Sequence, residues 1–168
     1  TLCRDLAHSI PRATRINRGK LNLSGVAEKA LESNADRIVI LDRWKGGPGK
    51  VEFFQVGSGG LTPVPPMFYV AGVRLQREFK AGIRPPRDLV VTTPPEGPPE
   101  TEKIAESLAS FLQIPVSTVA EAASKYPASM HVSSGPSGLT QITFLLLPEA
   151  LEVGPRLTLS HTAWEIRR

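Results

Sequence analysis

The chain contains the stretch Pro11–Lys20, which reads Pro-Arg-Ala-Thr-Arg-Ile-Asn-Arg-Gly-Lys and holds four cations and no acid. The β-branched residues within 13–16 predict a short strand, and Asn17-Arg18-Gly19 predicts the turn that follows it. Because side chains alternate along a strand, we expect the cations to gather at its end and in the loop beyond, where they suit phosphate groups. A solvated basic loop explains the same composition equally well.

The composition is that of a soluble globular protein with one domain or two small ones. Of its 168 residues, 40% are hydrophobic and 21% are charged. The single cysteine, Cys3, excludes a disulfide within the chain and fits a reducing, intracellular setting. We find no apolar run long enough to span a bilayer and no signal peptide, so no membrane partner is expected.

Charge is distributed unevenly along the chain. Residues 1–84 carry 14 Lys and Arg against 7 Asp and Glu, whereas residues 85–168 carry 6 against 9. The first half is therefore +7 and the second −3, which together give the net charge of +4. Arginine outnumbers lysine, and its guanidinium suits forked phosphate contacts and stacking on bases. A basic half predicts a polyanionic partner, although arginine-rich composition also accompanies hot habitats and GC-rich genomes.

Apolar periodicity predicts four helices. Leu2, Leu6 and Ile10 form one helical face that ends at Pro11. A second helix is expected with Ser24 as its N-cap and a stop at Ser33-Asn34. The others are Glu100–Leu112, which has the clearest periodicity, and Ser117–Ser124.

Apolar and β-branched runs predict seven strands. The run Ile38–Leu41 is typical of a central strand buried on both faces, and it is expected to form a hairpin with the next strand through the turn Lys45–Lys50. Gly57–Pro66 is expected to be a loop and Gly82–Pro86 a boundary. The predicted strands are Asp36–Trp44, Val51–Val56, Met67–Leu75, Arg87–Thr93, Ser129–Ser133, Leu139–Leu147 and Pro155–Ile166.

A weak internal repeat supports two halves. Gly47-Pro48-Gly49 before a strand resembles Gly135-Pro136-Ser137-Gly138, and Gly72–Leu75 resembles Gly154–Leu157. We therefore expect an α/β fold of two similar halves, 1–84 and 85–168. Each would have a mixed sheet covered by helices.

The sequence argues against an enzyme. The spacing of Cys3 and His8 does not suit a metal site on a helix, and no phosphate-binding Gly-x-x-x-x-Gly-Lys motif is present. His131 and Asp88 have no nucleophile motif beside them. No cofactor is expected. Phe53, Phe54, Phe68 and Tyr69 lie in predicted strands, and alternation puts one of each adjacent pair on the opposite face. One of these rings would then be a stacking platform for RNA bases, but coverage of both sheet faces by helix or loop is the favoured alternative.

Three islands, in order, resemble the Brix domain of Imp4-like ribosome biogenesis proteins. The first is Ile10–Gly19, which resembles the family's Pro-x-x-x-Arg-Ile-Asn-Arg-Gly signature. The second is Asp36–Gly49, with a strand followed by a Gly-Pro turn. The third is Leu151–Leu159, which resembles an acidic-apolar Glu-x-Gly-Pro-Arg motif. The given sequence does not contain the family's leading strand or the long charged tails of many eukaryotic members. We expect either that the first half lacks an edge strand or that it is trimmed, and the compact form is more similar to an archaeal member.

The resemblance implies a fold and a function. Each half would be like the anticodon-binding domain of class IIa aminoacyl-tRNA synthetases. The protein would be a non-enzymatic, cytoplasmic factor (nucleolar in a eukaryote). It would bind ribosomal RNA or its precursor during rRNA processing and subunit assembly, with other assembly factors as further partners. The residues expected to contact RNA are Arg12, Arg15, Asn17, Arg18, Lys20, Arg43, Lys45, Lys50, Arg74 and Arg156.

Two alternatives stay open at this point. The protein would otherwise be an interaction adaptor in a preribosomal complex that touches RNA only incidentally. Arg15 would otherwise be a structural residue that holds the two halves together, in which case its removal lowers the melting temperature rather than RNA affinity.

Overall fold

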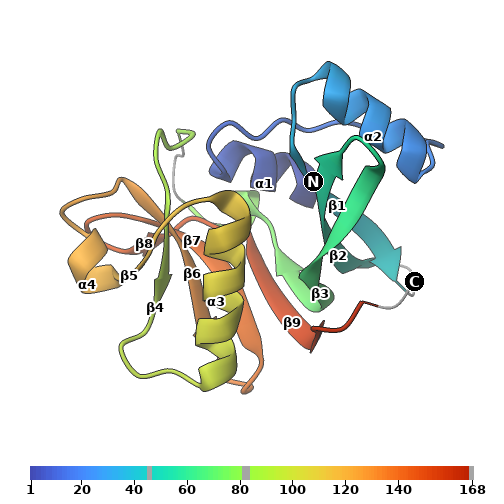
Figure 1. Cartoon of the computed structure of the whole chain (residues 1–168). Helices are drawn as coiled ribbons and strands as arrows, with labels where there is room; N and C mark the ends of the chain where they lie inside the picture. Colours follow the sequence, from blue (N-terminus) through green and yellow to red (C-terminus); the bar gives the residue numbers. More distant parts are fainter. Residues whose placement is uncertain (45–46, 81–83, 167–168) are drawn as a thin grey trace. The chain divides into compact units, whose positions relative to one another are not determined.

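The computed structural model describes residues 1–44, 47–80 and 84–166 (Figure 1). Within these ranges the chain forms four α-helices, one 3-10 helix and nine strands. It divides into two compact units, each made from separate stretches of sequence. Unit 1 contains Thr1–Arg15 and Ala71–Ser160, and unit 2 contains Ile16–Val70 with the described residues from His161 onward. The bounds of these two units differ from those of the predicted halves, 1–84 and 85–168. The division into two similar halves stays a prediction.

Unit 1 combines helices with a mixed sheet. Its strands follow the hydrogen-bonded order β9-β7-β6-β4-β5, and β8 also pairs with β7. The end of β3 (Gly60–Arg74) lies beside β9. The pairs β4–β5 and β4–β6 are parallel, whereas β6–β7 and β7–β9 are antiparallel. Its helices are α1 (Leu2–Ser9), η1 (Gln76–Glu78), α3 (Pro99–Leu112) and α4 (Val119–Ala122). Its strands are β4 (Val90–Thr93), β5 (Val116–Thr118), β6 (Ala128–Ser134), β7 (Thr140–Leu146), β8 (Leu151–Glu152) and most of β9 (Arg156–Ala163).

Helix α3 forms where its periodicity predicts it. Pro99 is the first helical residue, which costs no hydrogen bond, and two glutamates lie in the first turn, where they favour the helix dipole. The helix ends at Gln113, whose backbone is left-handed with φ 57°. Its buried face, which includes Ile104 and Leu108, packs against β4 and β6. The buried residues of β4 therefore lie in the core of unit 1.

Unit 2 has one helix and an antiparallel ladder. Helix α2 (Leu23–Glu32) packs against β2 (Gly47–Gly57), which pairs with β1 (Arg37–Trp44) and with β3 (Gly60–Arg74). The rings of Phe53 and Phe68 meet edge to face in its core, with centroids 5.4 Å apart. The β1–β2 hairpin is confirmed. The described strand pairs of residues 1–84 are antiparallel, so the mixed sheet predicted for the first half is wrong.

Several local predictions need correction. No strand forms at 13–16, because these exposed residues have no ladder partner among the described residues. The N-cap of α2 is Asn22 rather than Ser24, since the Asn22 side chain accepts the hydrogen bond from the Gly25 N–H at 2.9 Å. Strand β1 is an edge strand of unit 2 with Val39 37% exposed, rather than a strand buried on both faces.

One predicted loop and one predicted helix are shorter in the structure than expected. The predicted loop 57–66 is a tight turn, because β3 already starts at Gly60 and continues through its prolines. Proline lacks only the N–H donor, so a strand continues through it where that donor is not needed. The helix predicted from Ser117 starts at Val119, because 116–118 pair with β4 as strand β5 and the Thr118 hydroxyl caps the helix. Residues 45–46 and 82–83, parts of a predicted turn and boundary, lie outside the described residues.

Candidate functional site

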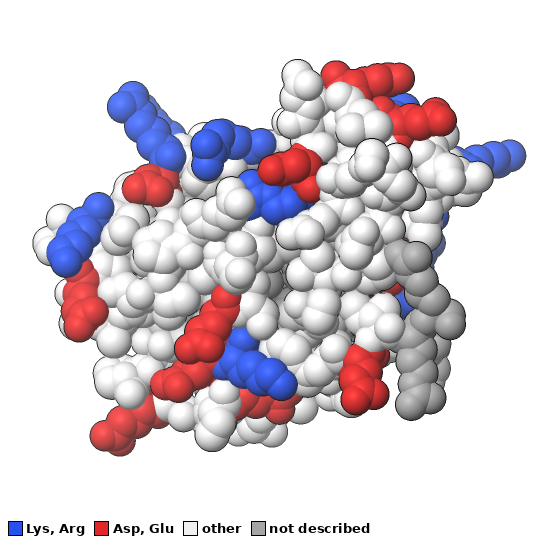
Figure 2. All heavy atoms as spheres, viewed as in Figure 1, with Lys and Arg blue, Asp and Glu red and all other residues white. Residues whose placement is uncertain are grey.

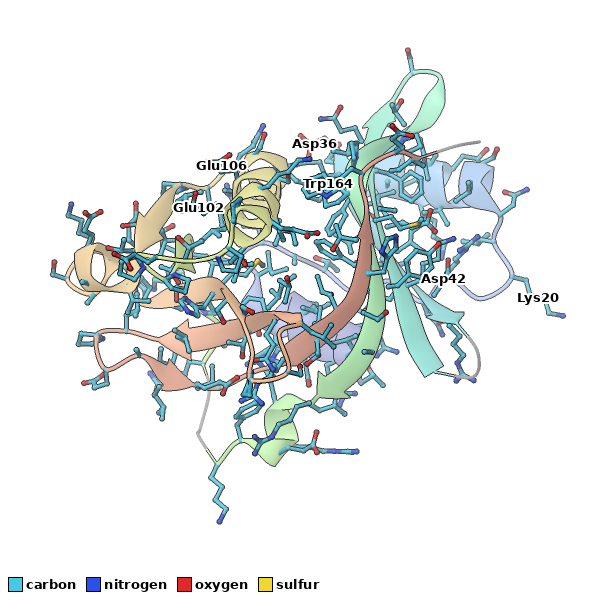
Figure 3. All side chains as sticks on the ribbon, turned by 90° about the horizontal axis from the view of Figure 1, so that it is seen from below. Lys20, Asp36, Asp42, Glu102, Glu106 and Trp164 are labelled. Carbon is cyan, nitrogen blue, oxygen red and sulfur yellow. The ribbon has the colours of Figure 1, made fainter. Side chains whose placement is uncertain are left out.

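The basic stretch Pro11–Lys20 is an exposed, irregular segment. It begins where α1 ends, and Arg12 has a left-handed backbone with φ 64°. The side chains of Arg12, Arg15, Asn17 and Lys20 are exposed. Within the described residues, these four side chains make no hydrogen bond or ion pair. Figure 3 shows Lys20 pointing away from the ribbon. Arg12, Arg15 and Lys20 therefore carry positive charges that no carboxylate neutralises locally.

Arg18 differs from its neighbours because it also shapes the loop. Its Nε donates to the Leu21 carbonyl at 2.9 Å, and its guanidinium lies 3.6 Å from the Asp42 carboxylate on β1. The turn itself uses Gly19, whose φ of +58° suits glycine. Arg18 therefore already has two protein partners in unit 2. Arg43, the residue after Asp42, is exposed.

Lys50 lies beside Asp42 in the ladder and is also paired. Its Nζ is 3.4 Å from the Glu52 carboxylate, and the Lys50 side chain is only 27% exposed. Because Glu52 partly neutralises its charge, Lys50 attracts a phosphate group less strongly than an unpaired lysine would. Lys45 lies outside the described residues.

Arg74 and Arg156 meet on one ring in unit 1. Both guanidinium groups lie over Phe79, at 4.3 Å and 5.5 Å from the ring centroid. Arg74 also donates to the Glu78 carbonyl at 3.2 Å. Cations stacked on a ring in this way contribute to stability. The sequence pattern did not identify Phe79.

Glu152 fixes Arg156 in place. Arg156 Nε donates to one Glu152 oxygen at 2.7 Å and its terminal nitrogen donates to the other, while Thr143 donates to Glu152 at 2.6 Å. Burial raises the pKa of Glu152, but these hydrogen bonds and the charges of Arg156 and Arg74 outweigh burial and hold the pKa below its usual value. The hydrogen bonds to Glu152 raise the pKa of Arg156. In the sequence, the only sign of this ion pair is that Glu152 precedes Arg156 by four residues.

The loop between Glu152 and Arg156 packs tightly. Gly154 has φ +67°, and a Cβ added there would lie 2.5 Å from the Phe79 ring. The Gln76 amide donates to the Gly154 carbonyl at 3.3 Å and to the Ser9 hydroxyl at 2.8 Å, and the Gln76 N–H donates to Asp5 at 2.9 Å. The Gly-Pro-Arg island therefore joins α1, η1 and β9 within unit 1.

A buried polar row in unit 1 has a structural explanation. The Thr92 hydroxyl donates to Ser129 at 3.1 Å and lies 2.8 Å from His131 Nδ1. Burial lowers the pKa of His131, and the charge of Glu152 opposes this only in part. Thr92 and Ser129 are fully buried and His131 is half-buried, so the hydrogen bonds of this row lie within the core of unit 1.

Metal clusters and membrane helices are both absent from the part of the chain that the structure describes. Its residues contain no group of three or more His, Cys, Asp or Glu side chains placed to hold a metal ion. None of its helices is long and apolar enough to cross a membrane.

The ten predicted contact residues thus fall into three groups. Arg12, Arg15, Asn17, Lys20 and Arg43 are exposed, whereas Arg18, Lys50, Arg74 and Arg156 also have protein partners, and Lys45 is not described. Elsewhere, red and blue side chains are interspersed on the face that carries α3, whose sequence has three glutamates and one lysine (Figure 2). The segment Pro11–Lys20 is therefore the best candidate for contact with an anionic partner.

Comparisons with known proteins give a consistent relationship. No family model matches the chain. A probable Brix domain-containing ribosomal biogenesis protein from Methanopyrus kandleri is 35% identical over 119 residues, which are 68% of this chain and 59% of that protein. Its counterpart from Aeropyrum pernix is 34% identical over 80 residues, 48% of this chain and 44% of that protein. The chain therefore spans less than two thirds of the length of these relatives.

Solved structures share the fold. The crystal structure of a probable ribosomal biogenesis protein from Aeropyrum pernix K1 has a TM-score of 0.74 and 24% identity, over 93% of this chain and 84% of that one. The crystal structure of Mil, an archaeal Imp4-like protein, has a TM-score of 0.55 and 15% identity, over 89% and 81%.

Proposed function

Because the chain is a homologue of the archaeal Brix domain-containing ribosomal biogenesis proteins, we propose that it is a non-enzymatic ribosome biogenesis factor that binds ribosomal RNA. It would act during rRNA processing and subunit assembly, with rRNA or its precursor and other assembly factors as partners. The halves 1–84 and 85–168, each like an anticodon-binding domain, belong to the same proposal.

One observation carries the RNA-binding part of the proposal. Arg12, Arg15 and Lys20 are exposed within a ten-residue segment that contains no acid. Cations without a local carboxylate partner keep their full attraction for phosphate, and their counterion release makes binding depend on salt. Arg74, which stacks on Phe79, and Arg156, which pairs with Glu152, have fewer hydrogen-bond donors and less unpaired charge left for phosphate.

The segment also has the geometry of a phosphate-binding loop rather than of a base reader. The side chains from Arg12 to Asn17 are all exposed and can therefore contact a phosphate chain. Such contacts position a protein on RNA without specifying sequence. Asn17 would add a neutral amide able to donate to phosphate or to a 2′-hydroxyl. We therefore expect recognition of folded rRNA mainly by its shape and charge.

Crosslinking in cells, followed by sequencing of the bound RNA, tests this function. The wild-type protein is expected to enrich precursor rRNA over total RNA, and a variant with Arg12→Ala, Arg15→Ala and Lys20→Ala is expected to lose most of that enrichment. Retention of protein partners at high salt, without an RNA crosslink above background, would instead establish the adaptor function.

A further inference from the structure

One face of the unit 2 sheet carries a row of polar and aromatic side chains. Asp42 on β1 pairs with Lys50 on β2, and Lys50 pairs with Tyr69 on β3. Residues directly opposite each other in an antiparallel ladder share a face. The Tyr69 ring in turn lies beside the His161 ring from β9, with centroids 5.9 Å apart and planes tilted by 31°. The row thus runs Asp42, Lys50, Tyr69, His161.

On β2 and β3 the opposite face is buried at the neighbouring ladder position. Val51 pairs with Phe68 in the next ladder position, and both are at most 4% exposed. Alternation therefore places Val51 and Phe68 on the face opposite to Lys50 and Tyr69. The row's own face is buried further along β1 and β2, at Ile40 and Phe54, whereas Tyr69 is half-buried and His161 is exposed.

The charges in this row are locally balanced. Asp42 lies 3.6 Å from the Arg18 guanidinium, and Lys50 lies 3.4 Å from Glu52. Two cations and two carboxylates leave this part of the face close to neutral. The row is therefore suited to the flat face of a base more than to a phosphate chain.

We propose that Tyr69 and His161 form a platform on which an unpaired RNA base stacks. This inference rests on the proposed function and specifies the class of RNA as single-stranded, such as a loop or bulge. Bases stack on aromatic side chains regardless of sequence, because every base has a π-face. Single-stranded segments are also the usual targets of such platforms, since bases in a helix are already stacked.

The platform belongs to the same unit as the last residues of the basic segment, because Arg18, Lys20 and Tyr69 all lie in unit 2. The Arg18–Asp42 contact joins the loop that follows Asn17 to the β1 end of the row. From Asp42 to Tyr69 is two strand spacings, or about 10 Å. A short single strand can therefore place a phosphate near Lys20 or Arg43 and a base on the platform.

The test compares two labelled RNAs, a single strand of about ten nucleotides and a hairpin with a stem of the same length, using fluorescence anisotropy. The variant is Tyr69→Leu with His161→Leu, which removes both rings but no cation. We expect it to bind the single strand at least about fivefold more weakly than wild type, because stacking contributes ~1–3 kcal/mol per base. Its salt dependence should not change, and its loss of affinity for the hairpin stem should be smaller.

Two further variants keep the result interpretable. Tyr69→Phe retains the ring and should bind as wild type does. His161→Leu alone changes an exposed residue, so it tests the platform even where the double variant has a lowered melting temperature. Wild-type affinity for the single strand in a folded His161→Leu protein and in the double variant would overturn the platform but leave RNA binding intact. Failure of the wild-type protein to bind either RNA would overturn both the platform and the proposed function.

Discussion

Arg156 donates two hydrogen bonds to the carboxylate of Glu152, which lies four residues before it at the other end of the Gly-Pro turn. Thr143 donates to the same carboxylate, and Phe79 lies under the guanidinium. An arginine that the sequence marks as an RNA ligand is therefore also part of the framework of unit 1.

Arg156→Ala should destabilise the protein by about 1–3 kcal/mol, because it leaves the Glu152 carboxylate, whose side chain is 27% exposed, without its forked partner. Arg156→Lys should recover only part of this loss, since an ammonium group cannot make the forked contact. Urea unfolding measures both variants, with Arg87→Ala as an exposed control. Equal stability of Arg156→Ala and wild type would show that the pair adds nothing.

Gly154→Ala should be more damaging than an ordinary glycine substitution. The new Cβ would lie 2.5 Å from the Phe79 ring, and the left-handed backbone at φ +67° disfavours alanine. We expect a loss above about 2 kcal/mol in unfolding free energy. Gly72→Ala is the matched control, since a Cβ there meets only Thr158 at an ordinary 3.9 Å. A similar melting temperature for the two variants would contradict this packing.

Stability should fall as the pH drops below the ordinary histidine value of 6.5. Burial lowers the pKa of His131 in the folded protein, so the unfolded chain binds this proton first as the pH falls. The stabilisation is therefore complete above 6.5 and is lost as the pH falls through the lowered pKa of the folded state. His131→Asn should show a smaller decrease in unfolding free energy between about pH 7.5 and 5.5. An unchanged pH dependence would assign the effect to other groups.

The sequence predicted the elements whose signals are local. Helix α3 follows its apolar period, and the β1–β2 hairpin follows two apolar runs around a glycine-rich turn. The strand expected at 13–16 failed because β-branched content does not supply a pairing partner. The N-cap of α2 is Asn22 rather than Ser24. Both residue types can cap a helix, and only the backbone geometry decides between them.

The candidate site was predictable as a composition but not as a set of interactions. The exposure of Arg12 and Arg15 agrees with an acid-free run of sequence. The pairing of Lys50 with Tyr69 depends on strand register, which short-range patterns do not fix. The contact of Arg156 with Phe79 joins residues far apart in the sequence, so it too depends on the fold. His161 joins Tyr69 from a distance of more than ninety residues along the chain, so only the fold brings these rings together.

The central claim is that the exposed cations of Pro11–Lys20 bind ribosomal RNA through its phosphates. The most direct measurement is the affinity for an rRNA transcript as a function of salt, for wild type and for the variant with Arg12→Ala, Arg15→Ala and Lys20→Ala. A control with Lys29→Ala, Arg87→Ala and Lys125→Ala removes three exposed cations elsewhere. The melting temperature of each protein shows whether Arg15 is instead structural.

We predict that the segment variant melts like wild type and binds more weakly, with a slope of log affinity against log salt smaller by ~0.7 for each phosphate that the variant no longer neutralises. The control variant should keep most of the wild-type affinity and slope. Wild-type affinity and slope in the segment variant, or an equal weakening in the control, would contradict the claim.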